Sequence, residues 1–337
     1  MPRLSVLDLV HVRSDQTSAD AIAASVALAR SAERLGYVRY WIAEHHNMPA
    51  VASTSPPVLV AIVAGATQRI RVGSGGVLLP NHAAFAIAEQ FALLEAGFPG
   101  RVDLGVGRAA GTDPLTSRAL GRHEGSVDDV LALLDLDGAS VSVDGRRRPL
   151  RVTPNPASAP PVWVLGASEG SARLAAEKGL PYVFGHHLGV GDTSAALRAY
   201  RSAFRPSAWS AAPRTLLPVR ASVAETSDEA HRAALPWLLV MLGLLTGRPQ
   251  APVATIEEAE KVELSAADRR IVEGMAAQYV IGSADEARAQ IEELAAAHGV
   301  DEVMVHPIAG SHDGADPRTA PAAEQTLRLL AGAGVRS

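Results

Sequence analysis

The sequence predicts an α/β fold and, within that class, a (β/α)8 barrel of the TIM type. Short β-branched apolar runs alternate with Ala-, Leu-, Arg- and Glu-rich segments of helical period from one end of the chain to the other. This order is typical of repeated βαβ units, and eight such units in 337 residues fit a closed barrel better than an open sheet. No composition break or Gly/Ser linker divides the chain, so we expect residues 1–337 to form a single domain.

Each element of this barrel follows from the same alternation. Gly36 and Gly179 stand where glycine commonly closes a helix, and short turns lead into the next strand. The expected strands are Leu4–Val10, Val38–Ala43, Ile70–Leu79, Val102–Gly107, Val162–Gly166, Tyr182–Phe184, Leu216–Ala224 and Glu302–Val305. The expected helices are Ser18–Leu35, Pro57–Ala66, Ala83–Ala96, Val127–Leu136, Ser168–Lys178, Thr193–Phe204, Asp228–Leu245, Ala284–His298 and Ala322–Leu330.

Two segments depart from the repeat. Residues Asp137–Val152 have the pattern of a β-hairpin excursion that turns at Asp144-Gly145. Residues Thr246–Gly274 are rich in Pro, Arg and Glu and lack a strong apolar stripe. We therefore expect the second segment to be a mobile insertion before the last βα unit.

The composition excludes several kinds of chemistry. The chain has no cysteine, which excludes disulfides, thiolate zinc sites, iron–sulfur clusters and a cysteine nucleophile. Lys178 and Lys261 are the only lysines among the 31 basic residues, so a Walker phosphate loop is absent and a Schiff-base enzyme is disfavoured. Any bound phosphate must therefore meet arginine or backbone N–H groups.

Charge and hydropathy indicate where the protein works. A formal charge of -5 and a pI near 6.1 argue against a general nucleic-acid binder. The first ten residues, MPRLSVLDLV, do not have the pattern of an export signal. The longest apolar stretch, Ala233–Leu245, is shorter than the ~20 residues that span a bilayer. We expect a cytoplasmic protein that binds neither nucleic acid nor membrane.

Polar residues follow several of the expected strands at their C-terminal ends, where barrel enzymes carry their chemistry. Strand two runs into Glu44-His45-His46-Asn47, and histidines also follow strands three and six, at His82 and His186-His187. Adjacent residues of an extended segment point in opposite directions, so only one of His45 and His46 can face the barrel mouth. That imidazole is suited to hydrogen bonding or proton transfer, since its ordinary pKa is about 6.5. A histidine that only fixes the loop is the alternative, and nothing in the spacing specifies a metal site.

Glycines in strands three and four indicate close contact with a ligand or a neighbouring backbone. Gly75-Gly76 interrupts an apolar strand, which requires a bulge or a tightly packed neighbour. Residues Gly105–Gly111 resemble a dinucleotide fingerprint but have the wrong spacing, G-x-G-x-x-x-G. Arg108 within this run can grip an oxyanion, or it can form an ordinary surface ion pair.

Ser168 and Ser171 stand at the beginning of an expected helix. A serine at this position is commonly an N-cap, whose hydroxyl accepts from the first turn. Beside Arg108 on an adjacent strand, the same hydroxyls and the free N–H groups of the helix also make a seat for phosphate. Both interpretations remain open from the residues alone.

Several motifs resemble those of the bacterial luciferase-like flavin monooxygenases, in the family's order and spacing. The resemblance extends from the first strand to about Ile308, and within the family it is strongest to the MsnO8-like branch of luciferase-like oxidoreductases. The motifs are residues 39–47, 71–82, 88–90, 99–108, 164–168, 179–182 and 279–283.

The resemblance implies a barrel that binds reduced FMN at its C-terminal rim and reacts it with O2. His45 is at the position of the family's active-site histidine beside the isoalloxazine, and Gly75-Gly76 is at the position of a non-prolyl cis peptide beneath the flavin. By position, the flavin phosphate meets Arg108, Ser168 and Ser171. Gly107 and Ala167 also belong to the implied cofactor site. Luciferase has cysteine and glutamate at these two positions, so the differences argue against light emission rather than against flavin binding.

The expected function is an FMNH2-dependent monooxygenase that oxidises a small organic substrate. No nicotinamide fingerprint is present, so reduced flavin would come from a separate NAD(P)H flavin reductase. An F420-dependent hydride-transfer enzyme and a non-catalytic flavin-binding protein are the alternatives.

The family also suggests how the site is enclosed and how copies of the chain associate. Trp41, Val77, Leu79 and Phe85 are expected to form an apolar wall, with residues 246–274 as a lid. A homodimer is expected through the small-residue helices Pro57–Ala66 and Ala83–Ala96.

Overall fold

The chain forms the expected closed, parallel, eight-stranded barrel, seen here in a computed structural model that describes residues 1–109, 111–135, 139–143 and 146–332. Around the barrel the order is β1, β2, β3, β5, β8, β9, β10 and β12, and β12 pairs with β1 to close it. The bounds are β1 Arg3–Asp8, β2 Arg39–Ile42, β3 Arg71–Ser74, β5 Val102–Gly107, β8 Val162–Gly166, β9 Tyr182–Phe184, β10 Thr215–Ala224 and β12 Glu302–Pro307.

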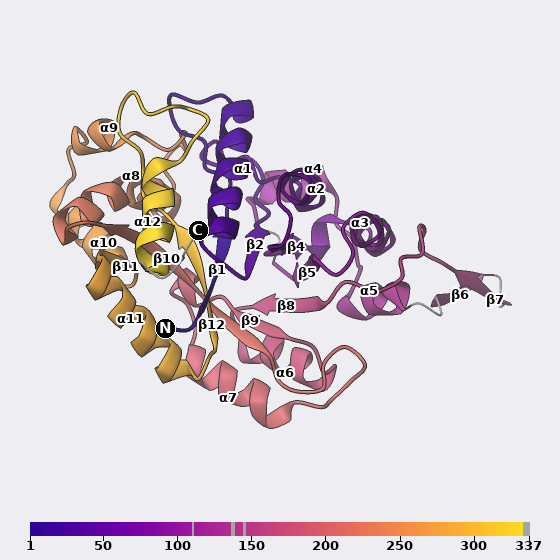
Figure 1. Ribbon diagram of the computed structural model, residues 1–337. Helices are drawn as coiled ribbons and strands as arrows, with labels where there is room; N and C mark the ends of the chain where they lie inside the picture. Colours follow the sequence, from indigo (N-terminus) through magenta and orange to yellow (C-terminus); the bar gives the residue numbers. More distant parts are fainter. Residues whose placement is uncertain (110, 136–138, 144–145, 333–337) are drawn as a thin grey trace.

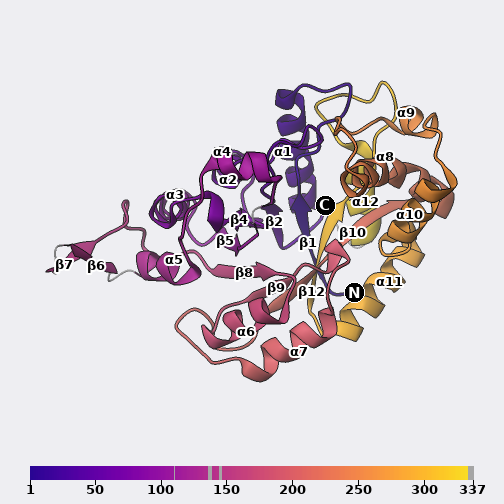
Figure 2. The same ribbon diagram turned by 180° about the vertical axis from the view of Figure 1, so that it is seen from behind.

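Helices surround this barrel, as Figures 1 and 2 show from opposite sides. No helix within the described residues is long and apolar enough to cross a bilayer. The helices that match the expected ones are α1 Ser18–Arg34, α2 Pro56–Ala66, α3 Ala84–Gly97, α5 Val127–Leu134, α6 Glu169–Glu177, α7 Thr193–Ala203, α8 Ser227–Thr246, α11 Ala284–His298 and α12 Pro321–Ala331.

Some elements were not expected from the sequence. The third strand continues after Gly75-Gly76 as β4 (Val77–Leu78) and the short helix η1 (Leu79–Asn81), and η2 (His186–Leu188) follows β9. Strand β11 (Val280–Ser283) pairs with the C-terminal end of β10, outside the repeat. Helix α4 (Pro114–Leu120) follows β5, and it buries none of its residues, which explains why no apolar stripe revealed it.

The two segments that depart from the repeat are present. Strands β6 (Ala139–Val143) and β7 (Arg146–Leu150) pair antiparallel as the expected hairpin, which projects away from the barrel in Figure 1, and the predicted turn at Asp144-Gly145 lies outside the described residues. The insertion at 246–274 contains the helix α9 (Ile256–Glu260) and most of α10 (Ala266–Ala276). Its mobility stays a prediction.

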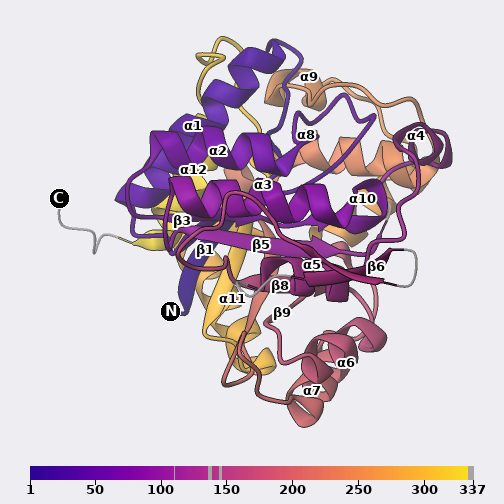
Figure 3. The ribbon, with the colours of Figure 1, turned by 90° about the vertical axis from the view of Figure 1, so that its right-hand side faces the viewer.

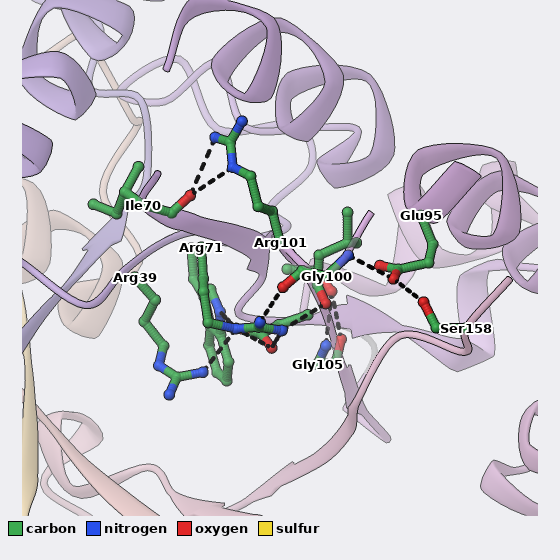
Figure 4. A network of polar contacts seen from close by, with 12 residues as sticks. Arg39, Ile70, Arg71, Glu95, Gly100, Arg101, Gly105 and Ser158 are labelled. Atoms are coloured by element: carbon green, nitrogen blue, oxygen red, sulfur yellow. Dashed lines mark hydrogen bonds and ion pairs between the residues drawn. The ribbon is translucent and has the colours of Figure 1, made fainter. Parts of the chain in front are cut away.

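The N-terminal end of the barrel is closed by buried charges (Figure 4). Asp103 accepts hydrogen bonds from Arg39 Nη1 at 2.7 Å and from Arg71 Nη2 at 2.6 Å. Arg39 also donates from Nε to Glu302 Oε1 at 2.6 Å. Arg39, Asp103 and Glu302 are all buried, and every one of these charges has an opposite partner, which is the condition for burying an ion pair without a large loss of stability.

An aromatic layer lies directly above these charges. The Arg39 guanidinium lies 4.9 Å from the ring centroid of Trp163 and 5.6 Å from that of Trp41. The two indoles meet edge to face, with centroids 5.4 Å apart, and Trp41 Nε1 donates to Asp103 at 3.0 Å. The charges thus hold the indoles in place, and the indoles separate the charges from the C-terminal half of the barrel.

Strands β3 and β5 approach each other too closely for side chains. A Cβ atom on Gly105 would lie 2.2 Å from the carbonyl oxygen of Ser74, and one on Gly73 would lie 2.4 Å from that of Asp103. Such contacts are with backbone, which cannot move aside without shifting a strand. The glycines therefore set the spacing of this part of the barrel.

Alanine in this contact should destabilise the protein, whereas alanine in an open position should not. We expect Gly105→Ala to lower the free energy of unfolding by about 1–3 kcal/mol or more, because the methyl group overpacks the strand pair. Gly97→Ala is the matched control, because Gly97 ends α3 with open space around it and alanine favours the helix by up to ~1 kcal/mol. Urea unfolding of both variants measures the difference; equal stability would show that β3 and β5 can separate freely.

Candidate functional site

A cavity of about 420 Å³ opens at the C-terminal end of the barrel, above Trp41. This volume is within the ~300–1,000 Å³ of small-molecule and cofactor sites. All of the sequence-predicted site residues line it: His45, Gly75, Gly76, Gly107, Arg108, Ala167, Ser168 and Ser171. The other lining residues are Leu7, Trp41, Ala43, Glu44, Leu78, Ala109, Gly111, Leu165, Gly166, Val183, Gly185, His187, Leu188, Pro218 and Met304.

The paired glycines form part of the cavity wall. The peptide bond between Gly75 and Gly76 is cis, as the resemblance implied. A Cβ atom on Gly75 would lie 2.7 Å from Leu7 Cδ1, and one on Gly76 would lie 2.8 Å from the carbonyl oxygen of Gly105. At Gly76 the neighbour is backbone, so a side chain has no room there, whereas at Gly75 the Leu7 side chain would have to move. Both glycines leave their backbone open to the cavity, where a ligand can approach closely.

Ser168 and Ser171 meet Arg108 on another side of the same cavity. Ser168 is the N-cap of α6, since its Oγ accepts from the N–H of Ser171 at 3.2 Å. Ser171 Oγ in turn lies 3.0 Å from the Tyr182 hydroxyl. Arg108 is exposed, and it also lines a neighbouring surface cavity that contains Arg122 and Lys178. A helix N-terminus, two hydroxyls and a guanidinium thus converge where an anionic group can bind.

Glu44 fixes the loop that carries His45. Its Oε1 lies 2.9 Å from Nε2 of both His46 and His82, and its Oε2 accepts from the N–H of Leu78 at 2.9 Å. Burial by itself raises the pKa of Glu44, but these hydrogen bonds and one from Asn81 outweigh it, and the net pKa lies below the ordinary value. Glu44 is therefore an ionised anchor, and His46 has the loop-fixing role that was one interpretation of the sequence.

His45 points the other way, into the cavity, as the alternation of the extended segment predicts. The backbone N–H of His45 donates to the carbonyl of Ser53 at 2.9 Å, and this bond holds the backbone in place. Burial lowers the pKa of His45 to about 4, so the imidazole is neutral at pH 7. The buried Nδ1 atom has no hydrogen-bond partner among the described residues. An unpaired polar atom at this depth is what a ligand would satisfy.

The remaining predicted histidines separate into different environments. His187 lines the cavity with His45, and burial lowers its pKa to about 3. His186 turns away, with Nδ1 2.8 Å from Thr193 Oγ1 and its ring beside His298. Within the described residues, no group of three or more His, Cys, Asp or Glu side chains is placed to hold a metal ion.

The family model for luciferase-like monooxygenases matches residues 2–302 of this chain. The chain belongs to the luciferase-like monooxygenase family. A luciferase-like monooxygenase of Escherichia coli K12 is 35% identical over 312 residues, which cover 90% of each chain. The solved structure of apo-MsnO8 superimposes with a TM-score of 0.83 at 33% identity, covering 98% of each chain.

Two more distant solved structures share the fold. The oxygenating constituent of 3,6-diketocamphane monooxygenase from Pseudomonas putida, in complex with FMN, has a TM-score of 0.68 at 18% identity and covers 98% of this chain and 97% of its own. An F420-dependent secondary alcohol dehydrogenase with an F420-acetone adduct has a TM-score of 0.66 at 17% identity and covers 100% and 99%.

The apolar wall of the cavity differs from the expected one. Trp41 lines the cavity, but Val77, Leu79 and Phe85 do not. Val77 and Leu79 are buried in the main core instead, because alternation along β4 turns Leu78, between them, toward the cavity. No residue of 246–274 lines the cavity.

The polar residues that lie inside the barrel near its mouth were not predicted from the sequence. Arg220 on β10 and His306 on β12 are opposite each other in register, and both are buried. His306 Nε2 lies 3.1 Å from Nε2 of His11, which stacks on Trp237 at a centroid distance of 4.4 Å. A charged or polar residue within an apolar strand, as in LLPVRASVA and EVMVHP, was the signal available in the sequence.

The buried histidines should make the stability of the protein fall as the pH is lowered. His11 and His45 have pKa values lowered by burial to about 4, and the pKa of His187 is lowered to about 3, from the ordinary 6.5. Above pH 6.5 they are neutral in the folded and unfolded chain alike. Between 6.5 and about 4 the unfolded chain binds protons that the folded chain does not, so stability is lost as the pH falls through this window.

We expect about 1–2 kcal/mol lost per buried histidine between pH 7 and pH 5. Urea unfolding at both pH values measures the loss, and pH 5 lies above the range in which most carboxylates titrate. His45→Gln should reduce this pH-dependent loss of stability by the amount due to one histidine. His231→Gln, at an exposed histidine, should leave the loss unchanged. A stability independent of pH between 7 and 5 would show that these imidazoles are not held neutral.

Proposed function

We propose that this protein is a flavin-dependent monooxygenase that uses reduced FMN and O2 to oxidise a small organic substrate. The observation that carries the proposal is the convergence, in one cavity, of the paired glycines, His45 and the Arg108–Ser168–Ser171 cluster. Membership of the luciferase-like monooxygenase family supports the same reaction class.

The residues present fit FMN in size, shape and charge. The phosphate would be held by Arg108, Ser168 and Ser171, where N–H groups, hydroxyls and a guanidinium meet. The ring would pack on Gly75-Gly76 and the backbone of Gly107 and Ala167, where close approach is possible. Bound reduced FMN supplies the electrons that activate O2. The apolar residues Leu7, Leu165 and Met304 exclude water from the deep part of the cavity.

His45 is the proposed catalytic residue. Its neutral imidazole can accept a proton or a hydrogen bond, and its Nδ1 atom has no partner in the described part of the protein. Glu44 positions it indirectly by fixing the loop through His46 and His82. A neutral imidazole of this kind can take part in proton transfer when a bound ligand changes its surroundings and thereby its pKa.

An F420-dependent hydride transfer is the second candidate. A fold neighbour contains an F420-acetone adduct, and F420 also carries phosphate. FMN is favoured here, because the relative at 35% identity is named a luciferase-like monooxygenase while the F420 enzyme is 17% identical.

We propose a cytoplasmic homodimer that receives reduced flavin from a separate NAD(P)H flavin reductase, with residues 1–337 acting as one domain. Helices α2 and α3 lie side by side on one face (Figure 3), and they expose Val58, Ile62 and Leu93 at 59%, 40% and 62%. Exposed apolar side chains on adjacent helices are suited to pairing two copies.

We also propose that residues 246–274 cover the mouth of the cavity. Backbone hydrogen bonds of Val253 to Val12 and Ser14 anchor the segment beside the end of β1.

Anaerobic titration followed by rapid mixing with O2 tests the function. We expect the protein to bind photoreduced FMN more tightly than F420 and to slow the release of H2O2 relative to free reduced FMN. His45→Ala should accelerate that release by about tenfold or more, because a positioned proton-transfer group is lost. Preference for F420 would favour hydride transfer. Flavin binding without any effect on the oxygen reaction would leave a binding protein, and an unchanged His45→Ala variant would remove His45 from the reaction.

The proposed phosphate site at Arg108, Ser168 and Ser171 leads to a separate prediction. Arg108→Ala should weaken FMN binding by about 10–100-fold, the usual effect of losing a charged hydrogen bond. Riboflavin, which lacks the phosphate, should bind the variant and the parent within about threefold. Fluorescence titration measures both, and Arg118→Ala on the exposed face of α4 is the control. An equal loss for both ligands would place Arg108 against the ring or in the fold instead.

A further inference from the structure

Arg220 is a buried cation for which the described residues supply no counter-ion. Only 8% of the residue is exposed. Its Nη1 donates to the neutral Tyr279 hydroxyl at 2.7 Å, and its Nε is buried without a partner. No described Asp or Glu forms an ion pair with it, in contrast to Arg39, which has two carboxylates. A charge buried in this way costs stability, so a compensating role is expected.

Strand geometry places Arg220 on the interior side of the barrel, beside the residues that line the cavity rather than among them. Pro218 and Met304 line the cavity, and they are opposite each other on β10 and β12. Arg220 and His306 lie two residues further along the same strands, so they point to the same interior side, one step nearer the mouth. Burial is the main cause that lowers the pKa of His45 and His187, and the positive charge of Arg220 adds to it in both. Arg220 is therefore close to two residues of the cavity wall.

The groups around Arg220 are unsatisfied in the same way. The Nδ1 atoms of His45, His187 and His306 are all buried without a hydrogen-bond partner within the described residues. These side chains come from β10, β12 and the ends of β2 and β9, whereas Arg108 and Ser168 come from the ends of β5 and β8. The mouth thus has a second polar sector, separate from the phosphate seat, with a fixed positive charge and several neutral donors or acceptors.

We propose that this second sector recognises the substrate, and that the substrate is an organic acid whose carboxylate binds Arg220. This proposal rests on the proposed function only in taking the bound acid to be the molecule that is oxidised. A guanidinium presents two parallel N–H donors that match a carboxylate, and one fixed charge matches a monoanion. The imidazoles of His45, His187 and His306 supply further hydrogen bonds, and Tyr279 holds the guanidinium in place.

Calorimetric titration of the flavin-free protein with benzoate and with benzamide tests this proposal. The two probes have the same shape and differ in charge. We expect benzoate to bind at least about tenfold more tightly than benzamide, and Arg220→Gln to remove that preference while FMN affinity stays within about threefold. Arg232→Gln, on the surface of α8, is the control and should leave both probes unchanged.

Other outcomes would overturn the proposal. These are equal binding of the two probes, no benzoate binding, or a preference that persists in Arg220→Gln. A lower Tm of Arg220→Gln with unchanged benzoate affinity would mark the arginine as structural. If Arg220→Gln does not fold, Arg220→Lys keeps the charge without the fork, and it should bind benzoate more weakly than the parent but still prefer it to benzamide. Failure of the parent to bind FMN would refute the flavin proposal alone, because the benzoate titration needs no flavin.

Discussion

The Arg39 ion pairs are the interaction on which the rest of the barrel depends. A parallel barrel of eight strands has an interior that side chains must fill, and here the N-terminal end is filled by charges rather than by aliphatic layers. Burying them is tolerated because Arg39 bonds both Asp103 and Glu302. Removing one partner would leave a desolvated charge directly below Trp41 and Trp163. Because the charges beneath them are paired, Trp41 and Trp163 are held in place at the bottom of the cavity.

The charged and titratable groups buried at the two ends of the barrel differ in whether they have partners. At the N-terminal end the carboxylate of Asp103 accepts from two arginines and an indole. At the C-terminal end the Nδ1 atoms of His45 and His187 and the Nε of Arg220 have no partner in the described structure. Folded proteins satisfy nearly all buried polar groups. Trp163 Nε1 and Thr215 Oγ1, in the N-terminal half of the barrel, are also without a partner, but neither is a cation or an imidazole. The difference indicates that the C-terminal polar groups are arranged for a ligand, and the N-terminal ones for the fold.

The sequence was sufficient for everything that depends on local pattern. Strand and helix order follow from periodicity, and the Ser168 cap follows from its place before a helix. The cis peptide at Gly75-Gly76 and the role of His45 were expected only from the resemblance to the family, because the residues themselves indicate no more than a close contact and one histidine facing the mouth. Val77 and Leu79 were assigned to the wall wrongly, because the face of a strand depends on its register after Gly76, which composition does not give. Arg220 and His306 were missed for a related reason: their significance appears only when β10 and β12 are paired.

The uncompensated charge of Arg220 adds to the effect of burial in keeping the surrounding histidines neutral. Burial is the main reason that the pKa of His306 is low, and the neighbouring His11 and Arg220 lower it further, so an additional proton in this sector would face like charge. An anion bound to Arg220 would cancel part of that field. Protonation of His45 or His187 would then become easier in the presence of the anion than in its absence. Substrate binding and proton availability would thus be coupled through one guanidinium, without movement of the backbone. A histidine with a pKa of about 4 in the free protein is then compatible with proton transfer at neutral pH, because the group that titrates during turnover is the histidine in the ligand-bound site.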